Sequence, residues 1–334
     1  MIDHEVRTHA LISASRIQRA SLCPGSVLAE EAMPPEPSSP AAMRGTIIHE
    51  LSEHLLAGRE LPEGADPELV EVAQTYVKAL DDFTQNIKRE YIELSVTDAL
   101  KTIHPALGGT ADYVGTGGGE IIVADLKTGR VNVDPEWNPQ LMTYALGAAI
   151  HLKAPPTVNV RLAIYQPEAG GWKQWTCGYQ DLMDWKDKLY DIAQAATKPD
   201  AIKVASEDAC KYCRARSVCP VLRATAVTVA KAEFQAIGAA TVEDAKLCQV
   251  FAESVLEKAV EQLKEKPDSI PGWKLREGRR MTKWTDHKMA EAMLTDRREA
   301  WELKSVSAVQ KLGIDIPAGL MTESRAAPSL VREK

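Results

Sequence analysis

The chain has 334 residues, which is long enough for one large domain or two with a buried core. Hydrophobic residues make up 45% and charged residues 26%, as in ordinary globular proteins, and the net charge of −7 excludes a surface that attracts polyanions as a whole. No stretch approaches about 18 apolar residues, and the first ten residues carry several charges. We therefore expect no membrane span, no secretory signal and a cytoplasmic location.

The first third of the chain predicts helices followed by a strand. Residues 13–22 are helical in character, and residues 47–56 place apolar side chains at one helix face. Residues 67–89 predict a longer amphipathic helix, with Tyr76 among its apolar positions. The alternating run 91–97 predicts a strand. Glu93 on this strand has two readings, contact with the site and a cross-strand ion pair, and we favour the ion pair.

Two β-rich runs, residues 110–114 and 121–127, flank a glycine-rich turn and predict a hairpin. When the two arms lie side by side, Asp112 and Asp125 approach each other although they are distant in the chain. Successive side chains on a strand point to opposite faces, so Asp125 and Lys127 share one face.

Two carboxylates beside one lysine leave an excess of negative charge, because like charges repel and one amine neutralises one acid. A hard divalent cation such as Mg²⁺ or Mn²⁺ supplies the missing charge and prefers oxygen ligands. It would lower the pKa of a bound water, which Lys127 would orient or help to deprotonate for attack on a phosphodiester. The alternative is a solvated hairpin with a surface ion pair.

A helix and further strands follow the hairpin. Residues 131–139 predict a loop and residues 140–150 a helix, on which Gln140 and Tyr144 lie four positions apart on one face. The β-rich runs 157–165 and 172–177 come next.

The segments Gly-Thr-Ala-Asp and apolar-Asp-Leu-Lys-Thr-Gly resemble the active-site hairpin of PD-(D/E)XK nucleases, specifically of the RecB-like branch. The resemblance covers residues 11–222 by motif and implies an α/β (α+β) fold, in which a central mixed sheet is flanked by helices. We expect residues 1–222 to form this core.

The resemblance assigns a role to each site residue. It implies that His49, in a Gly-x-x-x-His-Glu motif, holds the catalytic metal with Asp112, Asp125 and the backbone carbonyl of Leu126. Lys127 would activate water. Gln140 and Tyr144 form a Gln-x-x-x-Tyr motif that would border the site and position DNA or the lysine. Without the resemblance, His49 is an ordinary packed or surface histidine.

The cysteines suggest a second metal centre. Cys210, Cys213 and Cys219 are spaced so that their thiolates converge, and Cys23 is the suggestive fourth ligand. One upstream and three downstream cysteines resemble the AddB-type arrangement, which implies a structural [4Fe–4S] cluster. Zinc is the alternative, and unligated cysteines are the third reading. The remaining Cys177 and Cys248 are expected to be small buried hydrophobes.

Residues 223–334 are expected to form a helical C-terminal region with one basic segment between Trp273 and Trp284. The pattern suits contact with DNA phosphates and stacking of the tryptophans on unpaired bases. It is also compatible with a solvated basic hairpin. The basic residues in question are Lys274, Arg276, Arg279, Arg280 and Lys283.

The wider pattern consists of Ser-x-Ser near the start, Cys-Pro-Gly-Ser, and the late segment Pro-Gly-Trp-Lys-Leu-x-Glu-Gly-Arg. It resembles a phage and prophage group of RecB-like exonucleases. This resemblance implies hydrolysis of linear DNA, as duplex ends or single strands, in a bacterial or phage-infected cell. A phage single-strand annealing protein would be a partner. Two alternatives stay open, namely a non-catalytic DNA-binding protein with an Fe–S or zinc site and an endonuclease on the same fold.

Overall fold

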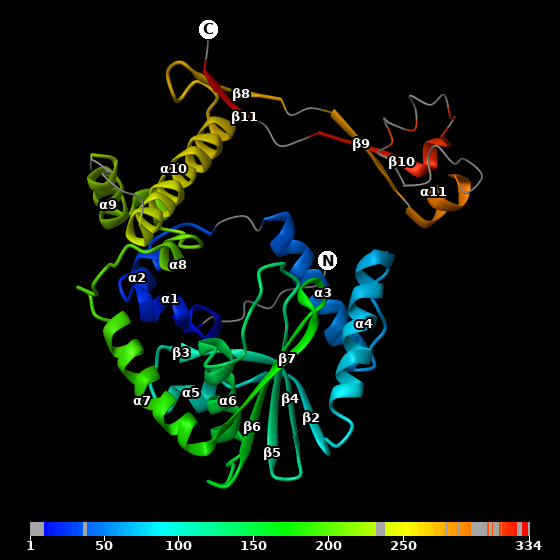
Figure 1. Cartoon of the computed structure of the whole chain (residues 1–334), viewed down its shortest axis with the longest axis vertical. Helices are drawn as coiled ribbons and strands as arrows, with labels where there is room; N and C mark the ends of the chain where they lie inside the picture. The colour runs from blue at the N-terminus through cyan, green and yellow to red at the C-terminus, as the bar shows by residue number, and fades with distance from the viewer. Residues whose placement is uncertain are drawn as a thin grey trace. The chain divides into compact units, whose positions relative to one another are not determined.

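The computed structural model describes residues 10–35, 39–231, 238–277, 280–285, 287–294, 306, 309, 314, 316–325 and 329–332. Its centre is a five-stranded mixed sheet in the order β2-β4-β5-β6-β7 (Figure 1). The strands are β2 (Arg89–Ser95), β4 (Thr110–Gly117), β5 (Glu120–Leu126), β6 (Asn159–Gln166) and β7 (Gly171–Gly178). Only β5 and β6 pair in parallel, and the other neighbours are antiparallel.

The turn between β4 and β5 forms because Gly118 and Gly119 both take positive φ, at 59° and 84°. Positive φ at both central residues is the requirement of a two-residue type I′ turn, which matches the twist of the flanking strands. The turn sets the pairing of Tyr113 with Ala124. Continued by one residue, this register places Asp112 directly opposite Asp125.

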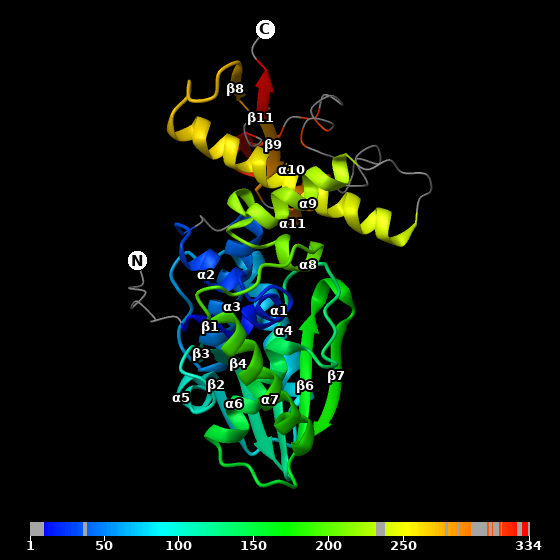
Figure 2. The same cartoon turned by 90° about the vertical axis from the view of Figure 1, so that its left-hand side faces the viewer.

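Helices cover both faces of the sheet (Figures 1 and 2). The core on one face contains residues of α1 (Ile17–Leu22), α5 (Thr97–Lys101), α6 (Pro139–His151) and α7 (Tyr179–Ala196). The other face is covered by α3 (Pro40–Leu56) and α4 (Pro67–Phe83). The mixed α/β architecture with a central mixed sheet flanked by helices agrees with the fold class expected from the sequence.

Capping residues fix the starts of the helices that carry site residues. Asn138 accepts hydrogen bonds from the backbone amides of Gln140 and Leu141, and Pro139 occupies the first position of α6. Ser39 caps α3 in the same way by accepting from Ala42. These caps determine which residues of each helix reach the sheet.

Two boundaries differ from the sequence analysis. Helix α4 ends at Phe83, before the expected residue 89, because Lys88 already donates to the carbonyl of Thr116 and starts the β2–β4 pairing. Helix α7 was not expected, although Asp181 caps its start by accepting from the amide of Gly178.

Shorter elements surround this core. A parallel pair joins β1 (Ile12–Ser13) to β3 (Leu107–Gly108). The remaining helices of the first unit include α2 (Ser26–Glu31), α8 (Glu207–Cys210) and α9 (Pro220–Ala230). No helix among the described residues is both long and apolar enough to cross a membrane.

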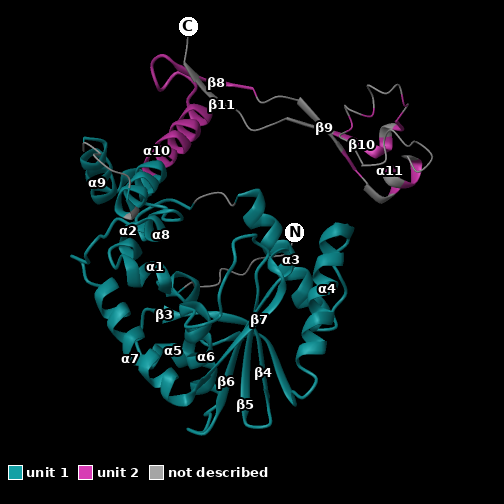
Figure 3. Cartoon of the chain, viewed as in Figure 1, with its two compact units in different colours: residues 1–250 teal, residues 251–334 magenta. Residues whose placement is uncertain are grey.

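The chain divides into two compact units, residues 1–250 and 251–334, and α10 (Ala239–Glu265) runs through the division (Figure 3). The sequence analysis placed the division earlier, at residue 222, but α9 continues past it and adds the buried residues Ala226 and Val229 to the first unit.

The second unit contains strands as well as helices. It comprises β8 (Trp273–Arg276), β9 (Arg280–Trp284), α11 (His287–Leu294), β10 (Met321–Arg325) and β11 (Ser329–Arg332). Strand β8 pairs with β11 and strand β9 with β10. The basic segment is therefore not a hairpin of its own, and that alternative is wrong.

We expect substitution Gly147→Ala on α6 to lower the free energy of unfolding by about 1–3 kcal/mol, as overpacking does. A Cβ at Gly147 would lie 2.6 Å from the Cβ of Val96, the residue before α5, so α6 and the start of α5 would have to separate. The expected loss is the net value after the roughly 1 kcal/mol that alanine adds in helix propensity. Urea denaturation measures it, with Gly129→Ala, where a Cβ meets nothing within 4 Å, as the control. Equal stability of Gly147→Ala and wild type would contradict this packing.

Candidate active site

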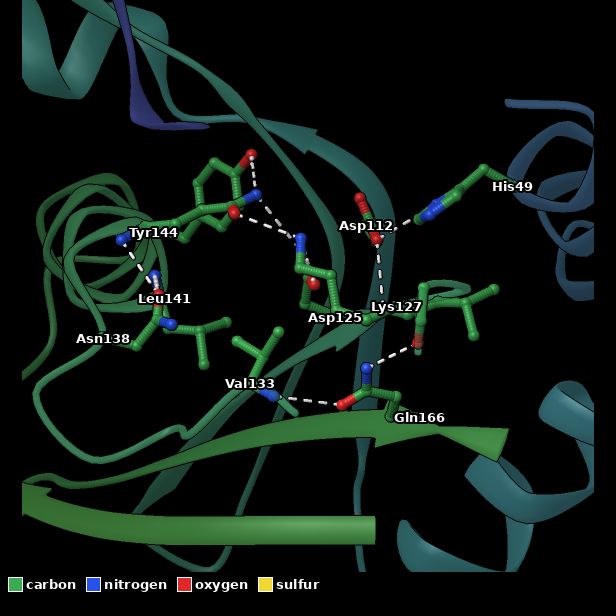
Figure 4. Close-up of polar contacts among 12 residues, drawn as sticks. His49, Asp112, Asp125, Lys127, Val133, Asn138, Leu141, Tyr144 and Gln166 are labelled. Carbon is green, nitrogen blue, oxygen red and sulfur yellow. Dashed lines mark hydrogen bonds and ion pairs between the residues drawn. The ribbon is translucent and has the colours of Figure 1, made fainter. Parts of the chain in front are cut away.

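Acidic, basic and amide side chains from β4, β5, α3 and α6 converge at the carboxyl end of β5 (Figure 4). Asp112 lies on β4, while Asp125 and Lys127 lie on and just after β5. His49 comes from α3, and Gln140 and Tyr144 come from the first turns of α6. The structure thus brings together all of the site residues expected around the hairpin.

Asp125 is the most buried charge of the group, with 2% of its side chain exposed. Its Oδ2 lies 2.7 Å from Lys127 Nζ, and its Oδ1 accepts from Gln140 Nε2 at 3.2 Å. Gln140 Oε1 in turn accepts from Lys127 Nζ at 3.1 Å. The same Nε2 lies 3.2 Å from the Tyr144 hydroxyl. One amide therefore holds the acid, the amine and the tyrosine together.

The charges in this group change each other's proton affinity. Burial raises the pKa of Asp125 above its ordinary value, and the nearby Asp112 adds to this, although Lys127 opposes it. Burial works to lower the pKa of Lys127, but the two carboxylates outweigh it and raise that pKa. Lys127 therefore keeps its proton in this arrangement and presents a positive charge.

His49 and Asp112 form the outer half of the site. His49 Nδ1 lies 3.3 Å from Asp112 Oδ2, and this oxygen also accepts from the backbone amide of Leu126 at 3.4 Å. Burial works to lower the pKa of His49, but its bond to Asp112 and the charge of that carboxylate raise the pKa overall. In Figure 4, Asp112 points toward His49, whereas Asp125 lies on the side of Tyr144.

Two glycines allow α3 and α6 to lie close to the strands that carry the acidic residues. A Cβ at Gly45, one turn before His49 on α3, would lie 2.9 Å from Thr128 Oγ1 in the segment after Lys127. A Cβ at Gly109, beside β4, would lie 3.1 Å from Tyr144 Cε1. At both glycines of the sequence motifs, the backbone therefore packs closely against a side chain of another segment of the site.

The sequence analysis placed two residues beside Asp112 differently, since it favoured an ion pair for Glu93 over contact with the site and gave Tyr76 only an apolar helix position. Glu93 has a φ of 52°, unusual for a residue other than glycine, and the pairing of its neighbours places it opposite Asp112, a like charge. Tyr76 is 2% exposed, and its hydroxyl has no hydrogen-bond partner in the described part of the chain. Both line a small cavity with His49. The only sequence signal was an acid within an alternating strand and a tyrosine on an apolar helix face.

The donor set fits a hard divalent cation. Asp125 Oδ2 is buried and, apart from the ion pair with Lys127, accepts no hydrogen bond among the described residues. Asp112 adds carboxylate oxygens, which Mg²⁺ and Mn²⁺ prefer, whereas the His49 imidazole is a donor more typical of transition metals. No three His, Cys, Asp or Glu side chains of the described ranges are already spaced as a metal site.

The segments that carry the four cysteines singled out in the sequence lie near one another, although among the described residues their side chains are not spaced as a metal site. Helix α8, which ends at Cys210, packs against α1, which ends before Cys23. Burial raises the pKa of Cys210, and the charges of Cys219 and Cys23 nearby add to the increase. Cys23 Sγ also accepts from the amide of Val204 at 3.3 Å. Cys177 is buried in the core, whereas Cys248 is only partly buried.

A buried acid fixes the loop that carries these cysteines. Glu30 on α2 is 2% exposed, and its Oε1 accepts from the Arg19 guanidinium at 2.5 Å and from the backbone amide of Arg214 at 2.8 Å. Burial, followed by the charge of Glu30, raises the pKa of Cys213 to about 11. Arg19 and Glu30 thus connect the N-terminal helices to the cysteine loop.

The basic residues expected to bind DNA lie in the second unit. Lys274 and Arg276 are exposed on β8, Arg280 and Lys283 lie on β9, and Arg279 lies outside the described residues. Trp284 is 8% exposed in the small core of this unit. The expectation that both flanking tryptophans stack on bases is therefore wrong for Trp284, because apolar neighbours cover its ring.

Comparison with known proteins matches a family model and several solved structures. The family model DUF2800, described as "Protein of unknown function", matches residues 9–313. A solved structure titled "Crystal structure of SSO0001" has 13% sequence identity over 65% of this chain and 90% of that chain, with a TM-score of 0.29. A TM-score this low carries no argument about the fold.

We expect Glu30→Ala to lower the free energy of unfolding by about 3 kcal/mol, because it leaves the Arg19 guanidinium and a backbone amide without their acceptor. The neighbouring Glu31→Ala on α2 is the matched control, since Glu31 is exposed. Urea denaturation of both variants measures the difference. Equal loss in the two would show that the buried pair does not stabilise the first unit.

Proposed function

We propose that this chain, which belongs to the DUF2800 family of proteins of unknown function, is a metal-dependent deoxyribonuclease that degrades linear DNA from its ends. The observation that carries the proposal is the hairpin register that sets Asp112 against Asp125, with Lys127 at 2.7 Å from the second acid. Burying like charges together is unfavourable without a compensating cation, so a purely structural role explains this group poorly.

The residues that would hold the cation are Asp112, Asp125, His49 and the backbone carbonyl of Leu126. When bound, Mg²⁺ or Mn²⁺ would supply a water of lowered pKa and positive charge against the phosphate oxygens. The buried Oδ2 of Asp125 supports this assignment, since the described residues offer it only the amine of Lys127.

The protein's own side chains would prepare the phosphodiester for attack. Lys127, held protonated by the two carboxylates, would orient the attacking water and place positive charge beside the phosphate. Gln140 would fix Lys127 and Asp125 relative to each other through one amide. The Tyr144 hydroxyl, 3.2 Å from the same amide, would border the DNA strand.

The order of motifs supports a RecB-like PD-(D/E)XK nuclease. His49, Asp112, Asp125 with Lys127, and Gln140 with Tyr144 follow one another along the chain and converge on one end of the sheet. From the same resemblance we propose a role in phage or prophage recombination, in a bacterial or infected cell, beside a single-strand annealing protein.

The cysteines would be the ligands of a structural [4Fe–4S] cluster, with zinc as the alternative metal. The segments that carry Cys23 and the Cys210–Cys219 triplet lie next to each other, so a cluster would connect the two ends of the nuclease core. Its contribution would be to folding, since metal binding to such a site is coupled to folding.

We expect Lys127→Ala to reduce cleavage of end-labelled linear duplex DNA at least about 100-fold in the presence of Mg²⁺, the lower range for loss of one group that stabilises charge in the transition state. Lys101→Ala, which removes an exposed lysine on α5, should leave the rate unchanged. Chelation of the metal should abolish cleavage by both proteins. Equal rates for Lys127→Ala and wild type would exclude this site as the catalytic one.

The same assay with circular DNA separates two kinds of nuclease. An exonuclease spares a covalently closed circle, whereas an endonuclease cuts it. DNA binding without cleavage of either form would indicate a non-catalytic DNA-binding protein.

For the cysteine centre we expect protein purified without oxygen to be brown with broad visible absorbance, and Cys210→Ser to be colourless. Cys177→Ser is the control, because Cys177 lies in the apolar core and outside the cluster. A colourless wild type containing one zinc would identify the alternative metal. A colourless wild type without zinc or iron would exclude both.

A further inference from the structure

The loop that leaves β5 is held by a glutamine at the end of β6. Gln166 is fully buried, at 0% exposure. Its Nε2 donates to the carbonyl oxygens of Gly129 at 2.6 Å and Val131 at 2.7 Å, and its Oε1 accepts from the amide of Val133 at 3.2 Å. Figure 4 shows Gln166 reaching this loop just after the Lys127 segment.

A lysine from β7 completes the attachment. Lys173 Nζ donates to Gln166 Oε1 at 3.2 Å, to the carbonyl oxygen of Val133 at 3.5 Å, and to the side chain of Asn132. Loops on protein surfaces normally turn their backbone groups to water and are mobile. Here alternate backbone groups of a short segment are bonded to two side chains of a neighbouring hairpin, so we expect the segment to be rigid.

Arg130 and Val131 are among the exposed side chains of this segment. The side chain of Arg130 is 88% exposed, and Val131 is 73% exposed. Arg130 pairs with Glu168 at 3.7 Å, but Glu168 is also half exposed, and such pairs contribute little. A surface whose backbone is already ordered avoids most of the entropy loss that binding otherwise imposes.

The segment of residues 129–133 lies close to the site in the chain, because it follows directly after Lys127 and Thr128. Arg130 follows Lys127 by three residues, so their Cα atoms are at most about 11 Å apart, given about 3.6 Å per extended residue. An arginine side chain at that distance reaches a phosphate next to the one that Lys127 would face. A branched apolar side chain beside it suits a sugar or the edge of a base.

We propose that Arg130 and Val131, held in place by Gln166 and Lys173, form the surface on which the site receives the DNA strand, with Gln166 as a positioning residue. This inference deepens the proposed function and rests on it, because the partner is the substrate of that site. The guanidinium binds a backbone phosphate, and the valine packs against the adjacent nucleotide.

Limited trypsin digestion tests the attachment without any DNA. Trypsin cleaves after Arg130 only when the loop opens, and mass spectrometry follows the cut between Arg130 and Val131. We expect this cut to be at least about tenfold faster in Gln166→Leu than in wild type. Gln174→Leu, at an exposed glutamine on β7, should be cut as slowly as wild type. An unchanged rate in Gln166→Leu overturns the inference.

If Gln166→Leu does not fold, Lys173→Met serves instead, because Lys173 is only partly buried and its removal breaks the bonds to Asn132, Val133 and Gln166. The same acceleration of the cut is expected. A wild-type rate in folded Lys173→Met likewise overturns the inference.

Binding of a fluorescent linear duplex in the presence of a chelator tests the partner. We expect Arg130→Ala to weaken binding about fivefold or more and to reduce the salt slope by about one, as loss of one phosphate contact does. Lys101→Ala is the control for loss of one positive charge. Cleavage by wild type together with unchanged binding by Arg130→Ala overturns this inference and leaves the nuclease proposal intact. Wild type that neither binds nor cleaves DNA overturns both.

Discussion

The register of one hairpin decides whether the site exists. Gly118 and Gly119 take the positive φ values that a two-residue turn requires, and the pairing that follows puts Asp112 opposite Asp125. A slip by one residue would move every side chain of a strand to the other face of the sheet. Five of the seven side chains of β5 are apolar and buried, so a slip would force them to repack against the helices on both faces and would carry the charged Asp125 to the opposite face.

Gln140 holds the buried acid of Asp125 and the amine of Lys127 in fixed positions. A carboxylate only accepts and an ammonium only donates, whereas one amide does both. Gln140 donates to Asp125 and accepts from Lys127, so the ion pair gains a third partner without an added charge. Its place on the first turn of α6 follows from the Asn138 cap. Helix capping thus contributes to the geometry of the charged group.

The hairpin and the start of α6 were predictable, because local sequence patterns determine both. The glycine turn, the β-rich run of β5 and the Asn-Pro start of α6 are local features, and they place Asp125, Lys127 and Gln140. The spacing of the cysteines likewise indicated that Cys210, Cys213 and Cys219 lie near one another. The second unit was less predictable, because β8 pairs with β11 and β9 with β10 across long intervals of chain. Burial of Trp284 depends on that non-local pairing.

The residues that the sequence did not reveal share one physical property, since each acts through a contact distant in the chain. Gln166 ends an apolar strand, where a polar residue ordinarily marks the start of an exposed loop. Its 0% exposure arises only because the loop after β5 folds back over the end of the parallel β6. Glu93 likewise combines a left-handed φ with a position opposite Asp112, and the alternating pattern of its strand does not indicate that φ. Backbone strain of this kind is found where surrounding structure enforces it, often at functional sites. Glu93 therefore lies with the charged group, whereas the sequence pattern favoured an ordinary cross-strand ion pair.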